Sequence, residues 1–267
     1  AFRLPNTFRR LFAEGTFNAA FIPSYTAANL KNKKKGKKFA DDVLSILLFI
    51  LIFIVTLAEI FTPYLLYLIA PGFVVDDMKF NLAVEFTRIT FPFLLFVSLA
   101  SFFSGILNSY NKFAAAAAAP IILNVVLIVV IYISYVENFN IAKQLSYGVT
   151  FAGILQLIFL IFLTYRFYKP KIKFLFIISK EVKFFFKKLL PSIFSSGVTQ
   201  INILVGTIIA SFQSGAVSYL YYAERVYQIN LALAGIAVGT VSLPVLSKLI
   251  KSKNLFKVFD IQNKSIQ

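Results

Sequence analysis

The segment 7–28 places charged side chains inside an otherwise apolar stretch. Arg9 and Arg10 are adjacent, and Glu14 follows four residues after Arg10 among phenylalanines and leucines. Residues four apart share a helical face, so Arg10 and Glu14 can pair. A guanidinium stays charged and offers a planar fork of donors that suits phosphate. Two interpretations stay open from these residues: a phosphate-binding site, or arginines that extend to lipid headgroups at the membrane surface.

Other kinds of chemistry are limited by missing residue types. The 267 residues contain no histidine and no cysteine, which removes the commonest general base, a common metal ligand and the thiolate nucleophile. The acid pair Asp41 and Asp42 fits a helix start, where carboxylates favour the dipole, better than a metal site. We therefore expect a protein that is not an enzyme and has no metal or cofactor.

The apolar residues fall into runs long enough to cross a bilayer. The chain is 59% hydrophobic with a mean hydropathy of +0.80, and a spanning helix needs about 20 mostly apolar residues. These runs predict an all-α, polytopic transmembrane helix bundle with about seven spans. The expected spans are 7–28, 43–69, 82–107, 113–136, 145–167, 189–212 and 217–246.

The basic residues predict which loops face the cytoplasm. The helices alternate in direction, so the loops form two sets, and 20 of the 27 basic residues belong to one set. That set includes the lysine block 31–38, which we expect to be a solvated loop, the stretch 166–188 and the tail from 248. Lysine-rich loops stay on the cytoplasmic side. The net charge of +16 therefore indicates membrane topology rather than binding to nucleic acid.

Five basic residues lie outside both loop sets, and all of them are arginines. With the predicted topology, the start of the first span and Arg225 lie toward the outer side, so their guanidinium groups can converge in an outward-opening cavity. Such a cavity suits an anionic, phosphorylated cargo. Arg88 lies three residues after Glu85 and can instead pair with it. The five are Arg3, Arg9, Arg10, Arg88 and Arg225.

Several motifs, in the same order along the chain, resemble one family. They include Pro5-Asn6-Thr7-Phe8-Arg9-Arg10-Leu11-Phe12-Ala13-Glu14-Gly15, Ala70-Pro71-Gly72-Phe73, Tyr219-Leu220-Tyr221-Tyr222-Ala223-Glu224-Arg225 and Gly239-Thr240-Val241-Ser242-Leu243-Pro244. The chain resembles the MurJ/MviN family of lipid II flippases, within the multidrug/oligosaccharidyl-lipid/polysaccharide exporter superfamily.

The resemblance implies a two-lobed transporter of about fourteen helices, of which this chain is a part. Because the chain has no initiator methionine and begins and ends abruptly, we expect a fragment. Residues 1–168 are expected to form the N-terminal lobe, with family spans two to six and the first span missing. Residues 169–188 are expected to be a basic amphipathic inter-lobe linker, and residues 189–267 the start of the C-terminal lobe, with spans seven and eight.

The resemblance also implies a function. A lipid II flippase moves undecaprenyl-pyrophosphate-linked peptidoglycan precursor from the cytoplasmic to the periplasmic leaflet of the bacterial inner membrane by alternating access. The implied partners are lipid II, membrane lipids and the cell-wall synthesis machinery. A polysaccharide-lipid or drug exporter of the same superfamily and a non-transporting scaffold remain alternatives. The energy source also stays open between membrane potential and ion coupling.

The same resemblance suggests roles for individual residues. Arg9, Arg10 and Arg225 correspond to cavity arginines that hold the pyrophosphate, and Glu14 to an acid of the same motif. Asn6 and Arg3 are further candidates for substrate binding. The remaining two charges, which are either structural or part of the cavity, are Arg88 and Glu224.

Overall fold

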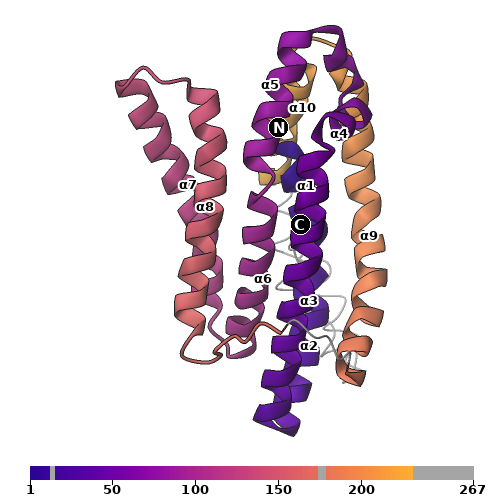
Figure 1. Cartoon of the computed structure of the whole chain (residues 1–267), viewed down its shortest axis with the longest axis vertical. Helices are drawn as coiled ribbons and strands as arrows, with labels where there is room; N and C mark the ends of the chain where they lie inside the picture. Colours follow the sequence, from indigo (N-terminus) through magenta and orange to yellow (C-terminus); the bar gives the residue numbers. More distant parts are fainter. Residues whose placement is uncertain (13–15, 174–178, 231–267) are drawn as a thin grey trace, which may run out of the picture. The chain divides into compact units, whose positions relative to one another are not determined.

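The computed structural model describes residues 1–12, 16–173 and 179–230, and these residues form helices without any β-strand (Figure 1). The chain divides into two units, 1–208 and 209–267, and each is described by itself. In chain order, the helices are α1 (Arg3–Phe12), α2 (Thr16–Lys31), α3 (Lys33–Ile60), α4 (Thr62–Ile69), η1 (Pro71–Val75), α5 (Asp77–Thr90), α6 (Phe93–Ser109), α7 (Phe113–Val136), α8 (Ile141–Thr164), α9 (Lys180–Ser211) and α10 (Ala216–Asn230).

Five helical segments of the described chain are long and apolar enough to cross a membrane. They overlap the second to the sixth predicted spans, so the prediction of an all-α polytopic membrane protein is confirmed. The predicted first span includes residues 13–15 and the seventh continues beyond 230. Both therefore lie partly outside the described residues and stay predictions. The five segments are Lys33–Ile60, Asp77–Ser109, Phe113–Val136, Ile141–Thr164 and Lys180–Ser211.

The lysine block is helical, so the prediction of a loop there was wrong. Helix α3 begins at Lys33, and the side chain of Asn32 caps it by accepting a hydrogen bond of 2.8 Å from the Lys34 amide. Lysine is a good helix former, and a capping asparagine satisfies one of the amides that a helix start leaves free. The positive-inside rule constrains the side of the membrane and leaves the secondary structure of the block undetermined.

Asp41 and Asp42 lie within α3 and are buried, so the expectation that they begin a helix was also wrong. The Tyr168 hydroxyl donates to Asp41 Oδ1 at 2.7 Å, and the Lys171 amide donates to the same oxygen at 3.1 Å. Lys173 Nζ donates to Asp42 Oδ1 at 2.7 Å. The two carboxylates therefore bind the segment that follows α8 to the basic end of α3.

Replacing Tyr168 with phenylalanine is expected to loosen this attachment. The hydroxyl is the buried donor to Asp41, and burial together with this hydrogen bond raises the pKa of Tyr168, so the phenol stays protonated and keeps donating. Losing a hydrogen bond to a charged group costs about 1.5–3 kcal/mol. Denaturant unfolding in detergent measures the loss. Tyr165→Phe is the control, because Tyr165 is exposed; an equal loss in both variants would contradict this role of Asp41.

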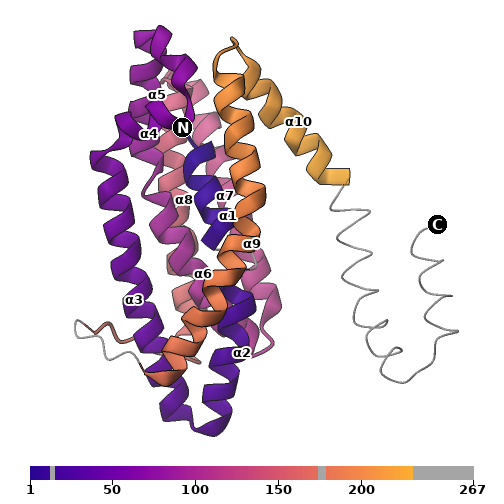
Figure 2. The same ribbon diagram turned by 90° about the vertical axis from the view of Figure 1, so that its right-hand side faces the viewer.

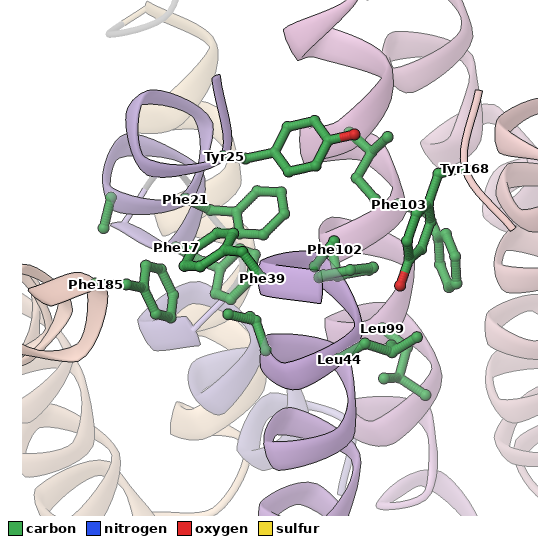
Figure 3. Packing of buried hydrophobic residues seen from close by; sticks show 14 of the residues in the cluster. Phe17, Phe21, Tyr25, Phe39, Leu44, Leu99, Phe102, Phe103, Tyr168 and Phe185 are labelled. Carbon is green, nitrogen blue, oxygen red and sulfur yellow. The ribbon is translucent and has the colours of Figure 1, made fainter. Parts of the chain in front are cut away.

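Aromatic rings fill the core between α2, α3 and α6, with a further ring from α9. Phe21 is fully buried, and its ring centroid lies 5.0 Å from that of Phe102, 5.2 Å from that of Phe17 and 5.9 Å from that of Phe39. Figure 3 shows these rings facing one another, with Phe185 at the edge of the group. This packing holds α2 against α3 and α6.

A glycine in α6 permits the close approach of α2. A Cβ atom at Gly105 would lie 2.6 Å from Asn18 Oδ1 and 2.9 Å from Phe21 Cδ1. Both distances are too short for a real contact, so a larger residue at this position would force the Asn18 and Phe21 side chains of α2 to shift. Small residues at helix interfaces are typical of membrane bundles.

The last part of the predicted linker is helical. Helix α9 begins at Lys180, so residues 180–188 continue directly into the helix of the sixth predicted span. Lysine at this end suits the predicted cytoplasmic side. The division into an N-terminal lobe, a linker and a C-terminal lobe stays a prediction.

Candidate functional site

The short helix α1 carries four of the predicted site residues and packs inside the first unit. Leu4 is buried in a cluster with Ala58 of α3 and Leu94 of α6, and the ring of Phe2 packs edge-on against that of Phe93 at 5.6 Å. In Figure 2, α1 is seen between α3 and α9. Its arginines are therefore presented from a helix that apolar neighbours hold in place.

Asn6 and Arg9 are brought together on α1. Asn6 is buried, and its Oδ1 atom accepts a hydrogen bond of 2.9 Å from Arg9 Nε. This bond fixes the orientation of the Arg9 guanidinium through its inner nitrogen. Sequence reasoning included Asn6 only as a further candidate; its position three residues before Arg9 is the signal for this contact.

Arg3 and Arg10 also have guanidinium nitrogens inside the protein. Nε and Nη1 of Arg3 and Nε of Arg10 are buried from solvent, while both residues remain partly accessible overall. Together with Arg9, this makes three positive charges on a helix of ten residues. Charges at such a position in a membrane protein indicate function by default, because burying them is costly.

Glu14 lies outside the described residues. Its predicted pairing with Arg10, and its predicted role beside the arginines, therefore stay predictions.

Pairing with Glu85 was one of two roles left open for Arg88, and within the described residues Glu85 pairs elsewhere. Glu85 Oε1 instead forms an ion pair of 2.8 Å with Lys143 Nζ, which joins α5 to α8, and no Glu85–Arg88 pair occurs in the described part of the chain. Glu59 of α3 lies within electrostatic range of Arg88, and its Oε1 atom is buried. Glu59 stands inside a predicted span, and an acid at such a position is the signal that could have drawn attention to it.

Arg225 and Glu224 lie on α10, in the second unit. Arg225 is exposed, and its Nη2 atom donates to the Tyr221 hydroxyl at 2.8 Å while its guanidinium carbon lies 4.9 Å from the centre of that ring. Glu224 Oε1 accepts a hydrogen bond of 3.1 Å from Gln228. Since the two units are described separately, the convergence of Arg225 with the arginines of α1 stays a prediction.

Long apolar helices and an arginine-bearing helix packed among them define a multi-pass membrane protein. A family model described as "Lipid II flippase MurJ" matches residues 1–267. The chain belongs to this family, as the motifs in its sequence indicated.

Individual relatives and a solved structure agree with this assignment. A probable lipid II flippase MurJ of Rickettsia prowazekii (strain Madrid E) is 41% identical over 272 residues, which cover 100% of this chain and 52% of the relative. A lipid II flippase MurJ of Burkholderia cenocepacia is 34% identical over 261 residues, 93% of this chain and 49% of the relative. A solved lipid II flippase MurJ in an inward closed conformation has a TM-score of 0.75 and 28% identity, covering 94% of this chain and 51% of its own. The chain thus spans about half the length of these proteins.

Proposed function

We propose that the full-length protein containing this chain is a flippase for lipid II in the bacterial inner membrane. It would carry the undecaprenyl-pyrophosphate-linked precursor from the cytoplasmic to the periplasmic leaflet without catalysing a chemical reaction. The observation that carries this proposal is the match of the lipid II flippase family model to the entire chain. The three arginines on α1 support it, because they suit a pyrophosphate.

The proposed role of the arginines is to bind the pyrophosphate of the headgroup. Arg9, Arg10 and Arg225 supply the principal donors, with Arg3 and Asn6 beside them. Asn6 accepts a hydrogen bond from Nε of Arg9 and so fixes the plane of this guanidinium, and a planar guanidinium suits a phosphate. Glu14 is proposed as the acid that pairs with these arginines when cargo is absent.

Alternating access would move the headgroup while the polyprenyl tail stays in lipid. The two lobes proposed to move against each other are the N-terminal lobe, residues 1–168, and the C-terminal lobe, which begins at residue 189. A membrane potential that is negative inside can drive the return of an empty, positively charged cavity, because each charge that crosses is worth about 2.3 kcal/mol per 100 mV. Coupling to an ion is the other candidate source of energy.

The test uses bacteria depleted of their own flippase and supplied with the full-length protein. Lipid II exposed at the outer leaflet is measured by its accessibility to an agent that does not cross the membrane. Restored accessibility is the expected result. Failure to restore it, by protein shown to be folded and in the membrane, would favour a polysaccharide-lipid or drug exporter or a scaffold. Hydrolysis of the pyrophosphate by purified protein would overturn the assignment as a non-enzyme.

A further inference from the structure

A pocket of about 320 Å³ lies where α2 and the start of α3 meet the segments that follow α6 and α8. This volume falls within the range of about 300–1,000 Å³ that is typical of small-molecule sites. The pocket belongs entirely to the first unit and is separate from α1. Its walls come from the α2–α3 and α6–α7 turns and the end of α8, which lie at one end of the bundle in Figure 1.

Four basic side chains line this pocket: Lys33, Lys37, Arg166 and Lys169. No acidic residue lines it within the described chain. Lys37 is ion-paired with Asp41 at 3.2 Å, so the other three basic residues supply most of the attraction for an anion that enters. The start of α3 adds to this potential, because helix N-termini carry partial positive charge.

Two of the cations are held in place by contacts with neighbouring groups. Lys37 Nζ donates to the Lys169 carbonyl at 2.9 Å and to Asp41 Oδ2 at 3.2 Å. Asp41 is also engaged by the Tyr168 hydroxyl, so its charge is shared among several donors. Lys169 Nζ lies 5.2 Å from the centre of the Tyr165 ring. The basic groups are therefore arranged partly before any ligand arrives.

Aromatic and polar side chains form the rest of the pocket wall. The rings of Tyr110 and Phe167 stack with centroids 4.9 Å apart. The hydroxyls of Tyr25 and Tyr110 lie 3.3 Å apart, and Asn29 Nδ2 donates to the Tyr110 hydroxyl at 3.4 Å. Figure 3 shows Tyr25 and Tyr168 at the margin of the aromatic core. Several residues of the pocket wall therefore also belong to the aromatic core or pack against it, which fixes their positions.

We propose that this pocket binds a phosphate-bearing anion at the end of the bundle predicted to be cytoplasmic. A phosphate matches the fork of Arg166 and the ammonium groups of the three lysines. The source is either the headgroup of an anionic phospholipid of the inner leaflet or free phosphate. Binding here involves no transport and none of the α1 arginines, so the proposal stands or falls independently of the flippase function.

Binding is tested by calorimetric titration of the full-length protein in detergent. The probes are short-chain phosphatidylglycerol, inorganic phosphate at constant ionic strength, and diacylglycerol as a probe without phosphate. The pocket variant combines Arg166→Gln with Lys169→Gln. Its matched control combines Lys34→Gln with Lys35→Gln, which removes the same charge from exposed residues of the lysine block that do not line the pocket. Lys33→Gln is a second, single-site pocket variant.

We expect saturable binding of a phosphate probe, weakened about tenfold or more in the double pocket variant, since charge-assisted hydrogen bonds to phosphate are strong. The control is expected to bind within about twofold of the wild type, because Lys34 and Lys35 do not line the pocket and solvent screens their charges from a ligand bound there. If phosphatidylglycerol binds and inorganic phosphate does not displace it, the pocket is a site for a lipid headgroup. Binding of inorganic phosphate alone identifies a site for the soluble anion. Equal weakening in pocket and control variants, unaltered binding in the Lys33→Gln variant, or no saturable binding would overturn the proposal.

Discussion

Replacing Arg9 or Arg10 with alanine is expected to abolish measurable translocation of lipid II by the full-length protein. Each change removes a guanidinium from a helix that is packed among apolar residues. Truncating one partner of a buried charge pair costs about 2–5 kcal/mol, so the rate should fall by at least about thirtyfold. Accessibility of lipid II at the outer leaflet of flippase-depleted bacteria is the measurement.

Lysine substitutions and a distant lysine provide controls for this series. Arg9→Lys keeps the positive charge and loses the planar fork. If the guanidinium binds phosphate through two parallel hydrogen bonds, this variant should therefore retain only part of the transport activity. Lys35→Ala removes an exposed charge of the lysine block and should leave transport unchanged. Normal transport in the Arg9→Ala and Arg10→Ala variants, at equal protein levels, would instead support arginines that extend to lipid headgroups.

Arg225 extends the same test to the second unit. Arg225 is exposed on α10, and its guanidinium donates to the Tyr221 hydroxyl. If Arg225 binds the same pyrophosphate, its replacement by alanine should lower transport as strongly as the α1 substitutions. The double change with Arg9 should then cost less than the sum of the two single changes, because groups that share one ligand are not additive.

Replacing Phe21 with alanine is expected to destabilise the first unit by about 3–5 kcal/mol, the usual cost of truncating a buried phenylalanine. The Phe21 ring is fully buried and contacts rings from α2, α3, α6 and α9. Its loss leaves a cavity that the neighbouring helices cannot close without shifting. Denaturant unfolding of the full-length protein in detergent measures the change.

Phe162→Ala is the matched control for this core substitution. Phe162 has the same chemistry and lies on α8, but 78% of its surface is exposed. A side chain that faces lipid loses few protein contacts on truncation, so the cost should be below about 1 kcal/mol. A similar loss in both variants would show that the aromatic cluster does not carry the stability of this region.

Hydropathy and charge predicted much of the architecture. Five of the predicted spans correspond to apolar helices, because backbone polar groups in lipid must bond within their own segment. The candidate charges were also visible, since Arg9 and Arg10 interrupt an apolar stretch. The nearby partner Asn6 lies within one helical turn of Arg9, so the spacing alone allowed its contact.

Apart from the lysine block, whose helix was expected to be a loop, the predictions that failed concern contacts between segments far apart in the chain. Asp41 and Asp42 suited a helix start by local rules, yet they bind Tyr168 and Lys173 from beyond α8. Glu85 had a basic residue three positions away and pairs instead with Lys143 of another helix. Local spacing shows which pairs are possible, and packing decides which of them forms.

The sequence by itself determined the membrane class and the family and suggested which residues bind phosphate, because each of these inferences depends on composition or on short motifs. Only the tertiary structure decided that Lys33, Lys37, Arg166 and Lys169 surround one pocket. These residues come from two regions of the chain, which meet because the helices between them fold back and pack around a shared aromatic core. Hydrophobic periodicity describes one helix at a time and contains no information on which helix ends become neighbours.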